Sequence, residues 1–174
     1  MMLNKLDNLV AAPWYWLALI VLGVSMEVSA LIYQYLLEYW PCVLCIHVRI
    51  WVLGLVVAAL IGLALRRRRV GRFIGHLLVL VISIGLLERS WQLLAIERGF
   101  AAAGECNFDA GLPNWFALDQ WFPAMFKVWE ACGYTPELLF GVTMAEALLV
   151  LSIMLVAMGT LLILALLTTK NLAR

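Results

Sequence analysis

The chain has 174 residues, of which 66% are hydrophobic and 13% are charged. Soluble globular domains have about half apolar and about a quarter charged residues, so a compact soluble fold could not cover this sequence with polar side chains. Lipid must therefore be the solvent for much of its surface. The net charge of +1 says little about partners. No glycine-rich linker or repeat divides the chain, so residues 1–174 are predicted to form a single membrane domain.

Four apolar stretches are long enough to cross about 30 Å of hydrocarbon as helices. They cover residues 14–37, 43–65, 70–92 and 144–167. The connection between the first two is so short that they must form an antiparallel hairpin, whereas residues 93–143 form the one long loop. The sequence thus predicts an all-α membrane protein, a bundle of four transmembrane helices.

Positive charges are concentrated on one side of this predicted bundle. Eight lysines and arginines lie at the two termini and between the second and third spans, against two, Arg98 and Lys127, in the long loop. Because Lys and Arg favour the cytoplasmic side, both termini are predicted to be cytoplasmic, with the hairpin and the long loop outside. The Arg66–Arg69 run is then a topological anchor. Val28-Ser29-Ala30 resembles a signal-peptidase site, but the apolar stretch is interrupted before it by Glu27 and continues beyond it.

The long loop carries a periodic set of large apolar side chains. They recur at spacings of three and four: Trp115, Leu118, Phe122, Phe126 and Trp129. Polar residues fall between them, which is typical of short helices lying in the membrane interface, with Pro123 breaking or restarting the helix. The alternative is an aromatic belt that only anchors the loop. Either arrangement holds the flanking Cys106 and Cys132 close to the membrane surface.

All four cysteines fall on the outer side of the predicted topology. Cys42 and Cys45 form a C-x-x-C pair at the start of the second span, whereas Cys106 and Cys132 bracket the aromatic segment of the loop. Four cysteines allow three pairings, and the sequence does not choose between them. The unpaired N–H groups and the dipole of a helix N-terminus favour a thiolate, and Pro41 suits a helix start. The C-x-x-C pair is therefore predicted to be reactive.

Three other uses of these cysteines have to be weighed. A zinc site would need four convergent ligands, and the loop cysteines lack a second C-x-x-C or C-x-x-H. Covalent haem attachment needs a histidine directly after the second cysteine, where this chain has Ile46. Purely structural disulfides are the main alternative. However, a bridge within C-x-x-C closes almost no loop and stabilises a fold poorly, so redox chemistry is the better interpretation.

Ionisable residues inside membrane spans are functional candidates. At about 1.5 Å per residue, Glu27, Arg49, Glu88 and Arg89 fall in one layer near the outer side. We expect Glu88 and Arg89 to neutralise each other inside the bundle. Arg49 lies four residues after Cys45 and seven after Cys42, so the three share a helical face. A cation there could bind the oxygen of a lipid-soluble electron acceptor, unless Glu27 competes for it through a salt bridge.

The two histidines, His47 and His76, lie near opposite ends of antiparallel helices. By the helical rise they are well over 10 Å apart in depth, so they cannot hold one haem between them. His76 is expected to be a polar residue near the inner interface. His47 lies close to Arg49 and is a further candidate contact for the electron acceptor.

These motifs together resemble the disulfide bond formation protein B family (DsbB). The resemblance covers essentially the whole chain. It rests on Pro41-Cys42-Val43-Leu44-Cys45-Ile46, Arg49, Cys106, Cys132, Glu27, Pro113-x-Trp115 and Asp119-x-Trp121-x-Pro123. The sequence departs from the family at His47-Val48, where a tyrosine-glutamate pair is common, which bears on the choice of quinone.

The resemblance implies a quinone-dependent thiol oxidoreductase of the bacterial inner membrane, with its cysteines facing the periplasm. Cys106–Cys132 would oxidise a thioredoxin-fold partner similar to DsbA, with Cys106 forming the mixed disulfide. Electrons would pass through a Cys42–Cys132 bridge to Cys42–Cys45. Cys45, as a thiolate, would reduce ubiquinone (or menaquinone), with Arg49 holding a quinone oxygen. Such a route is the known means by which the bacterial periplasm is kept oxidising, and it drives disulfide formation in secreted proteins.

Two functions from other classes remain as alternatives. A membrane scaffold with structural disulfides predicts no turnover, and a metal-binding transporter subunit predicts metal in the purified protein. Relatives of vitamin K epoxide reductase also combine four helices, four cysteines and a quinone. Their C-x-x-C pair lies at a later helix, which argues against that assignment.

Overall fold

The computed structural model describes residues 12–100, 109–138 and 141–172. Four long helices dominate it: α2 (Pro13–Leu36), α3 (Val43–Leu65), α4 (Arg69–Glu97) and α7 (Met144–Leu172). Each is long and apolar enough to cross a membrane, which confirms the predicted four-helix membrane fold. Cys106 lies outside the described residues, so its predicted position is not described.

The third helix is longer than the sequence predicts. It continues past residue 92 to Glu97, and its 29 residues correspond to about 44 Å at the usual helical rise. That exceeds the hydrocarbon thickness, so the polar end of α4 extends beyond the apolar layer. The helix ends where Gly99 adopts a left-handed conformation with φ of 73°, and the N–H of Phe100 then donates to the carbonyl of Ala95 at 2.8 Å.

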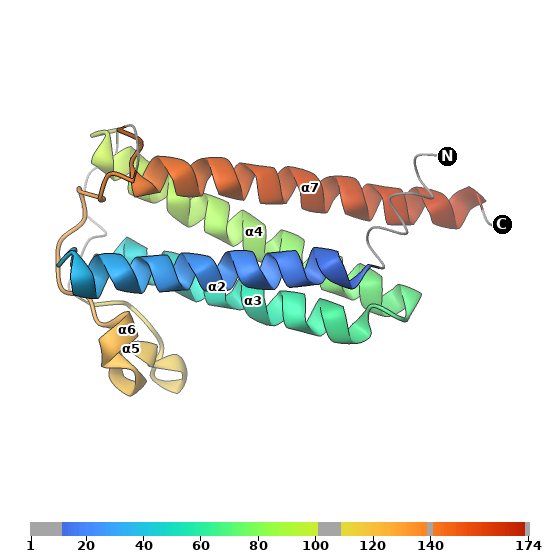
Figure 1. Ribbon diagram of the computed structural model, residues 1–174, viewed down its shortest axis with the longest axis horizontal. Coiled ribbons are helices and arrows are strands. Elements are labelled where there is room, and N and C mark those ends of the chain that lie inside the picture. Colours follow the sequence, from blue (N-terminus) through green and yellow to red (C-terminus); the bar gives the residue numbers. More distant parts are fainter. Residues whose placement is uncertain (1–11, 101–108, 139–140, 173–174) are drawn as a thin grey trace.

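The long helices run roughly parallel or antiparallel to one another, with α3 packed on α2, α4 on α3 and α7 on α4 (Figure 1). The turn between α2 and α3, which holds Cys42, lies at one end of the bundle. The turn between α3 and α4, which holds the arginine run, lies at the other end. We call these the cysteine end and the arginine end. Their separation agrees with the predicted connectivity.

A tryptophan fills the core near the arginine end. Trp16 is fully buried where α3 and α4 approach closely, and a Cβ at Gly62 would collide with its ring. His76 stacks against it, with ring centroids 4.8 Å apart, and is itself fully buried. His76 thus lies near the arginine end, the predicted inner side, but inside the core rather than on the surface. Its ring packs in the core against Trp16 and Tyr15.

The long loop contains three short helical segments, η2 (Asn114–Phe116), α5 (Leu118–Trp121) and α6 (Pro123–Phe126). In Figure 1, α5 and α6 lie beside α2 and α3 near the cysteine end. Pro123 is the first residue of α6, which confirms that it restarts the helix. The periodic apolar side chains are divided among these segments and differ in exposure. Phe126 is buried, whereas Trp115 and Phe122 are largely exposed, because the breaks between segments turn their faces apart.

Candidate functional site

The first cysteine of the C-x-x-C pair is the N-cap of α3. Cys42 has extended backbone geometry, and its sulfur accepts a hydrogen bond from the N–H of Cys45 at 3.3 Å. Capping of this kind satisfies one of the free N–H groups at a helix start. It also brings the Sγ atoms of Cys42 and Cys45 to 2.7 Å from each other. Both are free thiols, so the pair is a dithiol set for oxidation to a local disulfide.

The two thiols differ in their surroundings. Cys42 is 2% exposed, whereas Cys45 is partly buried and lines a cavity. The hydrogen bond with the Cys45 sulfur raises the pKa of Cys42, and burial raises it further. Cys42 therefore gives up its proton less readily than an ordinary cysteine, and Cys45 is the member with access to the cavity.

The loop segment that precedes Cys132 docks on the hairpin that carries this dithiol. The N–H groups of Trp129 and Glu130 both donate to the Pro41 carbonyl, at 3.0 and 3.4 Å. The rings of Trp129 and Trp40 lie 5.3 Å apart. Cys132 packs in the same apolar cluster as Cys42 and is disulfide-bonded. The structure therefore brings a loop disulfide up to the buried thiol of the C-x-x-C pair.

Arg49 lies one turn below Cys45 and ties the helices to the loop. Its Nη1 atom donates to the Gln34 side-chain oxygen and to the Met125 carbonyl, each at 2.7 Å. Its Nη2 atom donates to the Ala30 carbonyl at 3.2 Å. A guanidinium has five N–H donors, so these bonds leave two for another acceptor within the described structure. The possible salt bridge with Glu27 does not form, because an amide and two carbonyls take the guanidinium instead.

Gln34 is a residue of this site that sequence reasoning missed. It is 2% exposed, accepts from Arg49, and donates through Nε2 to the Ala124 carbonyl at 3.1 Å. The Tyr35 hydroxyl donates to the same carbonyl, at 2.5 Å. We call Gln34, Tyr35 and Arg49 the loop clamp. A buried amide in a membrane span was the signal that could have revealed it, since such groups are polar partners by default.

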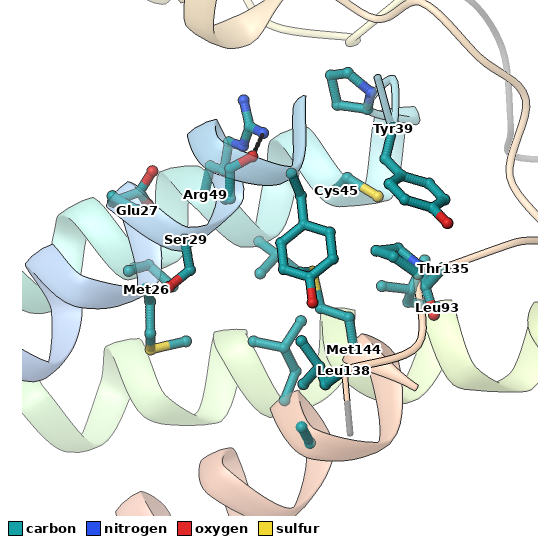
Figure 2. A pocket seen from close by; sticks show the side chains of 18 of the residues that line it. Met26, Glu27, Ser29, Tyr39, Cys45, Arg49, Leu93, Thr135, Leu138 and Met144 are labelled. Carbon is teal, nitrogen blue, oxygen red and sulfur yellow. Dashed lines mark hydrogen bonds between the residues drawn. The ribbon is translucent and has the colours of Figure 1, made fainter. Parts of the chain in front are cut away.

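A cavity of about 280 Å³ adjoins the dithiol. Figure 2 shows Cys45, Arg49 and Glu27 along one side of it. Its other walls come mainly from apolar side chains of α7, including Leu148 and Leu151, and from the loop around Thr135. The cavity lies where α2 and α7 are not packed on each other, because α7 packs along α4 instead. An apolar, flat molecule entering from lipid would meet Cys45 here.

The other predicted site residues lie away from this cavity. His47 directs Nε2 to the Ala110 carbonyl, 2.9 Å away, and is not among the lining residues. Glu88 is exposed and reaches Arg89 only through Gln92, which donates to Glu88 at 3.4 Å and accepts from Arg89 at 2.9 Å. The expectation of mutual neutralisation inside the bundle is therefore wrong, because their positions on α4 face outward, where Gln92 lies one turn away.

These features define a multi-pass membrane protein with a dithiol on the wall of an apolar cavity. Residues 12–162 match the family described as "Disulfide bond formation protein DsbB". Disulfide bond formation protein B of Shewanella loihica is 33% identical over 157 residues, which cover 90% of this chain and 92% of the relative. Disulfide bond formation protein B 2 of Pseudomonas aeruginosa is 34% identical over 145 residues, or 83% of each chain. The Haemophilus influenzae protein B is 33% identical over 164 residues, covering 94% and 93%.

The chain belongs to the DsbB family. It is a membrane disulfide oxidoreductase with a role in disulfide-bond formation.

Proposed function

We propose that this protein reoxidises a thioredoxin-fold dithiol oxidant of the periplasm, a partner similar to DsbA, and passes the electrons to a membrane quinone. The single observation that carries the proposal is the position of Cys45. Its partly buried sulfur touches that of Cys42 and also lines the apolar cavity that Arg49 and Glu27 border. One thiol is thus in contact both with its redox partner and with a space fit for a lipid-soluble acceptor.

The cavity suits a quinone in three respects. Its lining is mostly apolar, as a ring and a prenyl tail require. Arg49 keeps two N–H donors for a carbonyl oxygen, and a planar guanidinium matches such an acceptor well. The separation of α2 from α7 at this level gives the tail a route to lipid. Ubiquinone or menaquinone, when bound, supplies the two-electron acceptor chemistry. His47 is the weaker proposed contact, since it bonds to Ala110 instead.

The relay proceeds by disulfide exchange. The partner's dithiol attacks the bridge that we assign to Cys106 and Cys132, with Cys106 forming the mixed disulfide, and the partner leaves as a disulfide. Cys132, now a thiol, then exchanges with an oxidised Cys42–Cys45 pair through a Cys42–Cys132 bridge. Cys42 and Cys45 become thiols as the loop bridge re-forms. Their later oxidation gives up two electrons and two protons, which match those needed to form a quinol.

The same proposal fixes the orientation in the bacterial inner membrane. Both termini and the arginine end would be cytoplasmic, and the cysteine end periplasmic, because eight lysines and arginines lie in the sequence at the two termini and around the turn between α3 and α4, against two in the long loop. Impermeant thiol reagents should then label the reduced loop cysteines in intact spheroplasts. Labelling from the cytoplasmic face alone would overturn both the orientation and the partner assignment.

A redox titration of the four thiols, with and without quinone, tests the function directly. We expect one equivalent of reduced partner to yield one equivalent of quinol, with the thiols returning to disulfides. Without quinone, the protein should take up electrons from the partner only until its two disulfides are reduced. Thiols that fail to reoxidise with quinone present would exclude the quinone step. A purely structural pair of disulfides would show no exchange with the partner at all.

A further inference from the structure

One carboxyl group at the cavity makes no hydrogen bond within the described part of the chain. Glu27 lies in the middle of α2, is 6% exposed, and lines the cavity together with Cys45 and Arg49. Its Oε2 atom is buried without a hydrogen-bond partner. No ion pair or hydrogen bond to this side chain occurs within the described residues. In Figure 2, Glu27 lies beyond Arg49 as seen from Cys45, at the deep end of the cavity.

Several other buried polar side chains of the bundle do have partners, although the Nδ1 atom of His47 does not. Gln34 and Arg49 bond to each other and to the loop, and the buried hydroxyls of Ser83 and Ser90 bond within their own helix. A buried polar atom without a partner is costly, and most costly in an apolar layer. Arg49 attracts Glu27 electrostatically, but its described hydrogen bonds go to uncharged acceptors and none reaches the carboxyl group. The free carboxyl oxygen therefore points to a ligand that completes the site.

We propose that Glu27 binds the quinone carbonyl oxygen that lies farther from Cys45, which we call the inner oxygen. Glu27 then delivers to it one of the two protons that quinol formation requires. The inference rests on the quinone step of the proposed function. When Cys42 and Cys45 form their disulfide, they lose two electrons and two protons. The quinone gains both electrons; one proton reaches its inner oxygen from Glu27, and one of the two thiol protons reaches its other oxygen. Glu27 then takes up a proton released by the thiols, so the carboxyl group ends as it began.

A different role would place the same residue in the cavity. Glu27 could act only as a distant counter-charge to Arg49, since the two lie in one layer. That role requires no contact with the quinone. The two roles differ in what Glu27→Gln does, because glutamine keeps the shape and one hydrogen-bonding group but cannot transfer a proton. Glu88→Gln makes the same change at an exposed position on α4, outside the cavity, and is the matched control.

The first readout is binding and does not depend on turnover. Infrared difference spectra are taken when ubiquinone is added to the fully oxidised protein carrying isotope-labelled glutamate. Contact should shift a side-chain carboxyl band in the wild type and in Glu88→Gln, and the shift should be absent from Glu27→Gln. A shift that persists in Glu27→Gln, or the lack of any shift in the wild type although quinone binds, would overturn the proposal.

The second readout is the rate of quinol formation in a single turnover of the reduced protein at saturating quinone. Loss of a positioned proton donor should slow this step by about 100-fold and flatten its dependence on pH, while the apparent quinone KM stays within about twofold. A distant counter-charge would leave the pH profile unchanged. If Glu27→Gln does not fold, Glu27→Asp, which withdraws the acid by one methylene, is measured instead. Its rate of quinol formation should lie between the wild-type rate and the about 100-fold lower rate expected without a proton donor. Failure of the wild type to reduce quinone would instead reject the proposed function.

Discussion

The two ends of the bundle hold α2 in place by different interactions. At the arginine end, α2 reaches both neighbours: Trp16 is buried against α3 and α4, and Tyr15 packs on Leu162 and Leu166 of α7. At the cysteine end α2 and α7 separate around the cavity. Loss of that packing must be offset, because lipid provides no hydrophobic force between helices. Hydrogen bonds from the loop clamp take its place.

The difference shows where function can be located in such a bundle. The packed end contributes stability through its buried aromatic side chains. The open end holds the thiols, and its polar side chains bond across helices and to the loop.

Replacing Cys45 should abolish quinone reduction. Cys45→Ser removes the thiol that lines the cavity, whereas the loop bridge should still take one pair of electrons from the partner. Quinol absorbance and trapping of the mixed disulfide measure the two half-reactions. Cys106→Ser is the reciprocal control, which should lose partner trapping but keep reoxidation of Cys42–Cys45. If each variant lost both half-reactions, or neither, the two-pair relay would be wrong.

Arg49→Lys should weaken quinone binding strongly. Lysine keeps the charge but loses the planar fork that bonds Gln34, Met125 and Ala30 while leaving donors for a ligand. Loss of one charged hydrogen bond corresponds to about 1.5–3 kcal/mol, so the quinone KM should rise by about 10- to 100-fold. The rate of partner oxidation at limiting quinone measures it. A folded variant with unchanged quinone kinetics would show that Arg49 does not bind the quinone.

Trp16→Ala should affect the arginine end alone. Removing a fully buried tryptophan costs roughly 3 kcal/mol or more in soluble cores, so thermal unfolding in detergent should begin at a clearly lower temperature. The quinone KM should stay at the wild-type value, because the cavity does not touch Trp16. An increase in KM comparable with that of Arg49→Lys would mean that the two ends are not independent.

Gln34→Leu should release the loop without removing a charge. The change leaves the Ala124 carbonyl and one Arg49 donor with one partner fewer, at a cost of about 1–3 kcal/mol. Amide hydrogen exchange over residues 124–130 should become faster. Thiol–disulfide exchange between Cys132 and Cys42 should become slower. Gln120→Leu, at an exposed loop position, is the control. Unchanged amide protection in Gln34→Leu would show that the loop is held by other contacts.

The smallest effect concerns the thiol of Cys42. Its pKa is raised by the hydrogen bond with Cys45 and by burial, so the reactive thiolate forms only at higher pH than in an ordinary cysteine. In the reduced protein, its alkylation rate should still climb at a pH where a free cysteine has levelled off. Cys45→Ala removes the hydrogen bond and should lower the midpoint. Mass spectrometry of the labelled peptide follows both; a midpoint unaffected by Cys45→Ala would argue against the bond.

The sequence by itself determined the class, the helices and the dithiol. Hydropathy over some 20 residues is a local property, because backbone groups in lipid must bond within their own helix. Hence the spans at 43–65 and 144–167 begin where the sequence places them. The C-x-x-C pair and Arg49 were found by spacing along one helix, which a helical period of 3.6 residues fixes.

Only the tertiary structure decided which polar groups meet. Gln34 and the Met125 carbonyl are far from Arg49 in the sequence. No local pattern predicts that they, rather than Glu27, accept its hydrogen bonds. The same holds for His76, which packs on Trp16 inside the core, and for His47, which bonds to Ala110. The sequence gives each side chain a depth in the membrane, but its partner depends on how helices rotate and where the loop docks. Those are set by packing across the whole bundle.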